Sequence, residues 1–205
     1  MAKSTETRLT LMRAAEELFA ERSVAAVSLR EVTAAAGQRN VSAVVYHFGS
    51  KLELLECVLE RHSDPMQRMF LDRLQQMEND PTVTLRSLVE MLVAPLGAKL
   101  DDPDGGRRYL ALCAQLAASP DYPLTERRAA QAPGALALSQ RMLTFAPPIS
   151  PLLFPFRMMR FANILYLSFV DYMRLSNAGM QVPREVFLED LVTSLVQTVL
   201  GEVAE

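Results

Sequence analysis

Apolar residues recur three and four positions apart along most of the chain, and this spacing predicts helices rather than strands. The two segments nearest the C-terminus, 156–176 and 183–203, are the most apolar. Helices of that kind must bury more than one face, either in a large core or in a core and a subunit interface. We therefore predict an all-α fold. The other expected helices are 5–21, 28–36, 41–48, a long one from 50, 84–99, 106–118 and 133–145.

Short local signals mark two helix starts in the N-terminal part. Ser28 and Glu31 have the spacing of a capping box, and Ser50 and Glu53 repeat it. Gly37 is expected to end the helix that Ser28 begins, because glycine tolerates the left-handed conformation common at helix C-termini. Two short helices joined by a glycine-bearing turn form the arrangement that places a second helix in the DNA major groove.

The helix expected from about Asn40 or Val41 to Phe48 has two different faces. Its outward face has small polar groups, a methyl group and an aromatic ring, without a carboxylate, and this suits base edges and phosphates. A plain helical hairpin in an all-α domain is the alternative that the spacing leaves open. We expect a buried stripe of Val41, Val44, Val45 and Phe48, and an outward face of Asn40, Ser42, Ala43, Tyr46 and His47.

The run AAAGQRNVSAVVYHFGSKLELL resembles the DNA-binding signature of TetR-type (TetR/AcrR) transcriptional regulators. The resemblance spans residues 5–59. Its most specific part runs from Ala36 through Tyr46 and Lys51 to the paired leucines at 54 and 55. The turn from Gly37 to Asn40 is longer than the commonest form of the motif. The resemblance implies a three-helix helix-turn-helix head, residues 1–62, and a larger helical body, residues 63–205, that binds ligand and forms the dimer.

The same resemblance implies a DNA-binding transcriptional regulator, expected to be a repressor released from a pseudo-palindromic operator by a small, mainly apolar effector. Its expected partners are double-stranded DNA, a second copy of the chain and that effector. The expected DNA contacts are Ser28, Arg30, Arg39, Asn40, Ser42, Ala43, Tyr46, His47 and Lys51.

Charge is compatible with this interpretation. The chain has a net charge of -3, but its first 51 residues carry seven basic and five acidic side chains. A mildly basic head on an acidic body can contact a few phosphates. We expect the two cysteines, Cys57 and Cys113, to be reduced. The sequence shows no signal peptide and no apolar run long enough to span a bilayer, so we expect a soluble cytoplasmic protein.

Nine of the eleven methionines follow residue 62. Methionine is pliable and can line an adaptable apolar pocket, although it also fills ordinary cores. With the resemblance, this favours an internal ligand pocket between the long helix that starts at Ser50 and the body, with Pro65 as a break or a kink in that helix. The candidate ligand-binding residues are Met66, Met69, Phe70, Met91, Cys113, Met142, Met158 and Phe161.

In TetR-like proteins the last two helices pair with their mates, which implies the same interface here. A regulator that reads two half-sites needs such a rigid dimer, because its two reading helices must lie about 34–36 Å apart or a multiple of that. The candidate interface residues are Phe169, Met173, Leu188, Leu191, Leu195 and Val199.

The sequence gives little support for an enzymatic function. No metal-binding, P-loop or nucleophile-elbow motif occurs, so we expect neither cofactor nor metal. His62 is expected at the polar seam between head and body, and Asp101, Asp102 and Asp104 in a solvated turn. A helical carrier or scaffold whose head has lost DNA binding is the remaining alternative from another class, and an enzyme is the more remote one.

Overall fold

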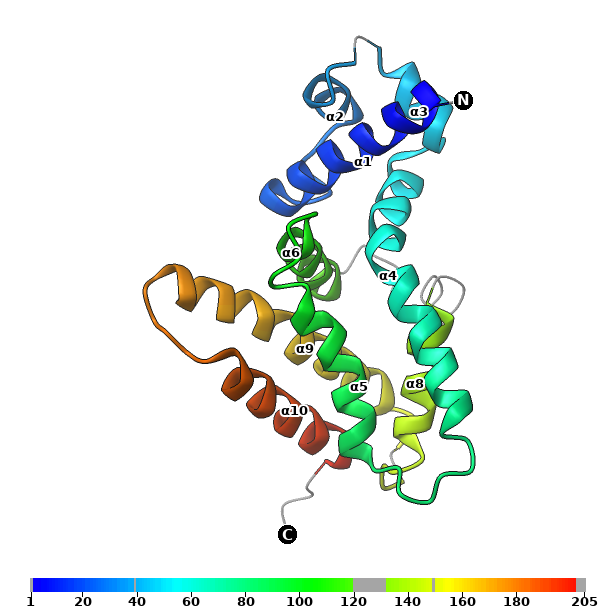
Figure 1. Cartoon of the computed structure of the whole chain (residues 1–205), viewed down its shortest axis with the longest axis vertical. Helices are drawn as coiled ribbons and strands as arrows, with labels where there is room; N and C mark the ends of the chain where they lie inside the picture. Colours follow the sequence, from blue (N-terminus) through cyan, green and yellow to red (C-terminus); the bar gives the residue numbers. More distant parts are fainter. Residues whose placement is uncertain (1, 39, 120–131, 149, 202–205) are drawn as a thin grey trace.

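The computed structural model describes residues 2–38, 40–119, 132–148 and 150–201, and every helix or strand assigned in these ranges is an α-helix. The predicted all-α fold is therefore confirmed. The molecule is elongated, with a small head above a larger body and one long helix running from one to the other (Figure 1). Within the described ranges, none of the helices combines the length and apolar character needed to cross a bilayer.

The head is built from α1 (Ala2–Arg22), α2 (Leu29–Ala35) and α3 (Ser42–Phe48), packed against the start of α4 (Lys51–Gln76). α1 also packs on α6 (Gly106–Ala118), a helix of the body. The head core accordingly includes two leucines of α6. Its buried members are Leu11, Met12, Ala15, Phe19, Val27, Val32, Ala36, Val44, Phe48, Leu54, Leu55, Val58, Leu112 and Leu116.

Local chemistry fixes the helix ends in the head. The Ser28 hydroxyl accepts a bond from the Glu31 amide, and the Glu31 carboxylate accepts one from the Ser28 amide, so the first capping box is complete. The Ser50 hydroxyl likewise accepts from the Glu53 amide at 3.1 Å. The Ser50 amide donates to Phe48 instead, so the second capping box is only half formed. Gly37 follows α2 with a φ of 67°, as the turn requires.

α4 runs without a break through Pro65, which is exposed. The pyrrolidine ring removes one helical hydrogen bond, but the neighbouring His62 and Met66 are buried and hold the helix on both sides of it. The expected domain boundary after residue 62 lies inside this helix. The division at that residue and the hinge at Pro65 therefore stay predictions.

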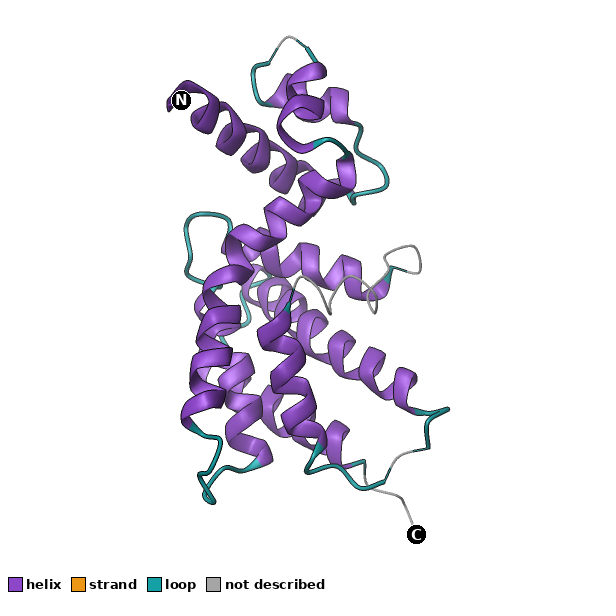
Figure 2. Ribbon diagram, turned by 90° about the vertical axis from the view of Figure 1, so that its right-hand side faces the viewer, coloured by secondary structure: helices purple, strands orange, loops and turns teal. Residues whose placement is uncertain are grey.

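The body helices pack around a second core. α4 lies against α8, α5 contacts α8 and α10, and α9 lies between α6 and α10 (Figure 2). Close approaches are made possible by glycine: a Cβ on Gly134 of α8 would lie 2.3 Å from the Gln67 carbonyl oxygen of α4. The predicted helices agree with the observed ones to within a few residues. The observed bounds are α5 (Leu85–Ala98), α6 (Gly106–Ala118), α8 (Pro133–Leu143), α9 (Phe154–Asn177) and α10 (Arg184–Leu200).

Candidate nucleic-acid interface

The orientation of α3 is set by two buried side chains one helical turn apart. Val44 and Phe48 point into the head core, and α3 packs on α2 and α4 through them. The opposite side carries Ser42, Val45 and Tyr46, which are all exposed. These three lie at positions i, i+3 and i+4, so they share one face of the helix. α3 lies at the head end of the molecule, away from the body (Figure 1).

One residue of the predicted stripe is misplaced. Val45 was expected in the core, but 52% of its surface is exposed. Each residue of a helix is rotated by about 100° from the one before, so Val45 turns away once Val44 is buried. Val41, by contrast, is half-buried as a stripe position should be. The short helix therefore buries two of the four apolar residues that were assigned to its core face.

The predicted base-reading residues differ in availability. Asn40 and Ser42 are exposed, and the Asn40 Oδ1 atom accepts a hydrogen bond from the Ser42 amide at 3.0 Å. This bond holds the start of α3, and the Asn40 amide nitrogen has no hydrogen-bond acceptor among the described residues. Ala43 is half-buried and packs on the head core, so its methyl group is less accessible than expected. Arg39 lies outside the described residues.

Tyr46 is the most exposed large side chain of α3, at 82%. Its ring meets the half-buried His47 ring edge to face, with centroids 5.1 Å apart. An aromatic ring with a hydroxyl at its tip can reach a phosphate while its body stays packed on a neighbour. The arrangement fits the predicted backbone-contacting role of both residues.

The candidate phosphate contacts at helix starts are partly engaged. The Ser28 hydroxyl donates to the Glu31 carboxylate at 2.8 Å, and Arg30 is exposed. Lys51 Nζ donates to the Ala25 carbonyl oxygen at 3.3 Å, which joins the start of α4 to the loop between α1 and α2. Partial burial of Lys51 lowers the pKa of its ammonium group. Lys51 therefore has a structural contact in addition to any contact with DNA.

The carboxylate of Glu31 has a strongly shifted pKa. It accepts bonds from the Ser28 amide and hydroxyl and from Arg22 Nη1, the last at 2.7 Å. The backbone bond from Ser28 is the largest cause, and together these donors lower the pKa of Glu31 to about 2. The negative charge is thus neutralised within the head.

A buried polar joint holds the head to the body; His62 lies at this seam as expected, but its partners were not predicted. Glu16 of α1 is fully buried, and its carboxylate contacts His62 Nε2 at 2.7 Å and Arg61 Nη2 at 2.5 Å, both on α4. Arg61 continues to Asp104 in the loop before α6, at 2.6 Å. On its other side His62 Nδ1 lies 3.2 Å from Lys99 Nζ. We call Glu16, Arg61, His62, Lys99 and Asp104 the joint.

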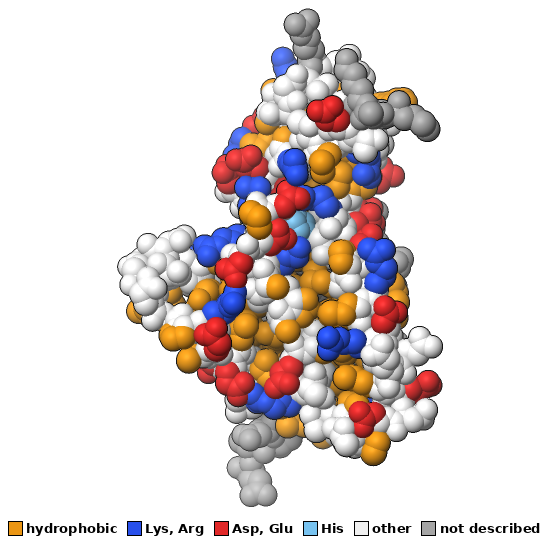
Figure 3. Space-filling model, in the orientation of Figure 1, with side chains coloured by type: hydrophobic (Ala, Val, Ile, Leu, Met, Phe, Trp, Pro, Cys, Tyr) orange, Lys and Arg blue, Asp and Glu red, His pale blue; other side chains and the backbone are white. Residues whose placement is uncertain are grey.

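The joint also explains the acidic turn between α5 and α6, which is not simply solvated as expected. Asp102 accepts from Lys99 at 2.7 Å, and this bond is the main cause that lowers the pKa of the Asp102 carboxyl. Asp101 pairs with Arg184 of α10. Charged side chains gather at the level where head and body meet (Figure 3). Side chains of this turn therefore bind α4 and α10 directly, and they are linked to α1 through Arg61.

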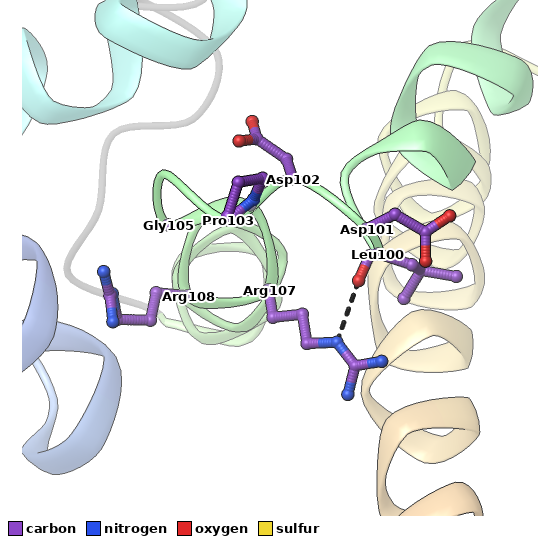
Figure 4. Close-up of a pocket in the computed structure, with 8 residues that line it drawn as sticks. Leu100, Asp101, Asp102, Pro103, Gly105, Arg107 and Arg108 are labelled. Carbon is purple, nitrogen blue, oxygen red and sulfur yellow. Dashed lines mark hydrogen bonds between the residues drawn. The ribbon is translucent and has the colours of Figure 1, made fainter.

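A surface hollow of about 280 Å³ lies beside this turn. Its wall is mostly backbone and charged side chains, with Arg107 donating to the Leu100 carbonyl oxygen at 2.9 Å (Figure 4). The predicted ligand-binding residues are elsewhere. Most of them share the body core, either buried (Met66, Phe70, Met91, Cys113 and Met142) or packed on its edge (Met69 and Phe161); Met158 is half-buried on α9. The structure thus brings seven of the eight together, as packed core.

The predicted dimer residues must be corrected. Phe169 on α9 and Leu191, Leu195 and Val199 on α10 are buried in the chain's own core, and Met173 and Leu188 pack on that core. Sequence periodicity identified the more apolar face of each helix, and that face is buried in the core of the body rather than exposed for a partner. The large apolar side chains that α9 and α10 expose are Phe154, Phe156, Met159, Leu167, Leu175, Val186 and Leu200.

In the described part of the chain, no three His, Cys, Asp or Glu side chains are grouped so that they could hold a metal ion. Neither Cys57 nor Cys113 forms a disulfide in the described part of the chain. Arg8 Nη2 lies 3.0 Å from the Cys57 sulfur, and burial raises the pKa of that thiol. A raised pKa disfavours the reactive thiolate form.

The comparison with known families decides the assignment. Residues 11–58 match the family described as bacterial regulatory proteins, tetR family. The helix-turn-helix head of this chain belongs to the tetR family. The matched segment contains most of α1, all of α2 and α3 and the start of α4, so it coincides with the helices that form the candidate interface. TetR-family proteins are regulators and not enzymes.

A curated relative in this family is the HTH-type transcriptional repressor BepR of Brucella suis biovar 1 (strain 1330). It is 32% identical over 95 residues, which is 46% of this chain and 44% of BepR. The chain therefore matches less than half the length of that relative.

Solved structures share the fold over nearly the whole chain. NalD, the secondary repressor of the MexAB-OprM multidrug efflux pump in Pseudomonas aeruginosa, has a TM-score of 0.61 and 22% identity, covering 98% of this chain and 100% of NalD. A TetR-family regulator from Streptomyces coelicolor has a TM-score of 0.52 and 20% identity, covering 95% of this chain and 80% of that one. At these identities the likeness shows that this chain and those regulators have a common fold.

Proposed function

We propose that this chain is a DNA-binding transcriptional repressor that acts as a homodimer in the cytoplasm and is released from its operator by a small, mainly apolar effector. One observation carries the DNA-binding part: α3 is fixed by buried Val44 and Phe48, and its exposed face, with Ser42, Val45 and Tyr46, has no carboxylate. Such a face can approach DNA without electrostatic repulsion. BepR and NalD, which are named as repressors, support the same assignment.

The proposed DNA contacts fall into two classes. Asn40 and Ser42, at the start of α3, and Arg39 are proposed to contact base edges. Tyr46, His47, Ser28, Arg30 and Lys51 are proposed to contact phosphates, which fix orientation without reading sequence. Ala43 has a minor role because it packs partly on the head core.

The proposed dimer uses the outer faces of α9 and α10. A single apolar side chain on a surface is normal, but a contiguous apolar patch indicates an interaction site. Large apolar side chains are exposed on both helices, including Leu167 and Leu175 on α9 and Val186 and Leu200 on α10. The inner faces of the same helices are used by the core, so one pair of helices serves both purposes.

The proposed effector would act on the methionine-containing body core. Met66 of α4 lies in one core with Met91 of α5 and Met142 of α8, so a ligand that separates these side chains would move α4 relative to the body. α4 carries both joint residues Arg61 and His62 and also contacts α3. Binding in the core would in this way change the placement of the DNA-reading helix.

Selection of binding sequences from random duplex DNA tests the proposal. The purified chain should enrich an inverted repeat whose half-site centres lie about 10–10.5 base pairs apart or a multiple of that. Enrichment of no common sequence would overturn the DNA-reading role. The effector part is tested separately: a compound that weakens operator binding must itself bind less tightly when operator is present, by the same factor.

A further inference from the structure

Val45 has an unusual position for an aliphatic residue. It is 52% exposed on α3, between Val44, which is fully buried, and Tyr46, which is 82% exposed. Ser42 lies one turn earlier on the same face. The buried Val44 and Phe48 prevent the helix from rotating to hide Val45. Its side chain is therefore held on the surface that the proposed function assigns to DNA.

The chemistry of valine restricts what it can recognise there. Its side chain has two methyl groups and neither a donor nor an acceptor. Among the base edges in the major groove, the thymine C5-methyl is the apolar group that such a side chain matches. Placed against the N7 and O6 acceptors of guanine, the same methyl groups would displace water without replacing its hydrogen bonds.

The valine side chain also has little conformational freedom before it makes this contact. A β-branched residue in a helix has one strongly preferred χ1 rotamer, so little side-chain entropy is lost when it is covered. Asn40, Ser42 and Tyr46 carry polar groups that can bond bases or phosphates, so Val45 adds a kind of readout that those exposed neighbours do not provide.

We propose that Val45 is a specificity-determining residue that contacts the C5-methyl group of a thymine in each operator half-site. This inference rests on the proposed function, because it names what one position of the DNA-reading face selects. It predicts that thymine is required at one position of each half-site for its methyl group, in addition to any preference read by hydrogen bonds.

Deoxyuridine substitution isolates that methyl group. In the selected operator, each thymine is replaced in turn by deoxyuridine, which keeps base pairing and removes only the C5-methyl. One position per half-site should weaken wild-type binding about fourfold, equivalent to about 0.8 kcal/mol for one buried methyl group. For the V45A variant the same substitution should have almost no effect, because the partner methyl groups are already gone.

A control removes exposed apolar surface away from the proposed DNA-reading face and the proposed dimer interface. Leu71 on α4 is 41% exposed, so L71A shortens an aliphatic side chain on the surface of the body. L71A must keep the full fourfold dependence on the thymine methyl. Thermal unfolding of V45A should match the wild type, since the side chain is largely exposed and alanine favours helix.

Two results would overturn the inference while the proposed function stands. The first is a wild-type protein that prefers the operator yet binds equally well after each deoxyuridine replacement. The second is a methyl dependence that is equally large in V45A, because another residue would then contact that thymine. A protein without preference for any selected duplex would instead overturn the proposed function itself.

Discussion

The carboxylate of Glu16 in α1 lies 2.7 Å from the imidazole Nε2 of His62 in α4, and both side chains are almost completely buried. Lys99 Nζ faces the other imidazole nitrogen at 3.2 Å. The buried imidazole therefore lies between a carboxylate on one ring nitrogen and an ammonium group on the other, and Arg61 Nη2 also lies 3.0 Å from Nε2. The second Glu16 oxygen accepts from Arg61, so the buried carboxylate has a donor on each oxygen.

Removing the Glu16 carboxylate should therefore be costly. An E16A variant leaves His62 and Arg61 in the seam without their acceptor, and breaking a buried pair in this way typically costs about 3–5 kcal/mol. Urea unfolding at pH 7 measures the change. E17A, at the exposed neighbouring position, is the control and should stay within about 0.5 kcal/mol of the wild type. Equal stabilities of E16A and E17A would show that the joint does not hold the fold.

Gly105 provides an independent test of the same contact. Its φ is 95°, and a Cβ there would lie 2.4 Å from a Glu16 carboxylate oxygen. Gly179 has a similar φ of 87°, but a Cβ there would have nothing within 4 Å. G179A should cost about 1–2 kcal/mol for left-handed strain alone. G105A should cost clearly more in the same unfolding experiment, and equal costs would mean that Glu16 moves away freely.

The capping box predicts a specific acid dependence. The pKa of Glu31 is lowered to about 2 in the folded chain from an ordinary value of 4.5. A depressed carboxyl pKa adds stability that is complete above the unfolded value and is lost as pH falls toward the folded value. The stability difference between wild type and E31Q should thus be constant above about pH 5 and shrink between pH 4.5 and 2. A difference that is independent of pH across that window would contradict the assignment; E17Q is the control.

The corrected dimer surface can be tested with two matched charges. Leu167 of α9 is 42% exposed and Leu71 of α4 is 41% exposed. L167E should dissociate the dimer in sedimentation while helix content and melting temperature stay near the wild type. L71E should change neither property. L195E should unfold the chain, since Leu195 is fully buried in the body core. A dimeric L167E would rule out this part of α9 as the interface.

What the sequence could predict was mostly local. The Ser28–Glu31 capping box follows from a spacing of three residues, and α6 begins at Gly106 and ends at Ala118 where the periodicity placed it. The motif around Tyr46 to Lys51 led to the tetR family, which the match over residues 11–58 supports.

Contacts between distant segments were not predictable in the same way. Glu16 and His62 are 46 residues apart, and a single acidic residue on an apolar stripe does not reveal its partner. Similarly, the periodicity of α9 and α10 gives their most apolar faces but cannot say whether a core or a partner covers each face. Val45 was misplaced because four apolar residues were assigned to the core face of α3. A helix of seven residues buries only two of them, Val44 and Phe48.

The proposed function depends above all on the exposed face of α3 recognising a DNA sequence. The decisive measurement is the ratio of two dissociation constants at one fixed salt concentration, for the selected operator and for a scrambled duplex of equal length and composition. The operator should bind at least about 10³-fold more tightly than the scrambled duplex, as in specific protein–DNA complexes. Equal dissociation constants for the two duplexes would contradict it.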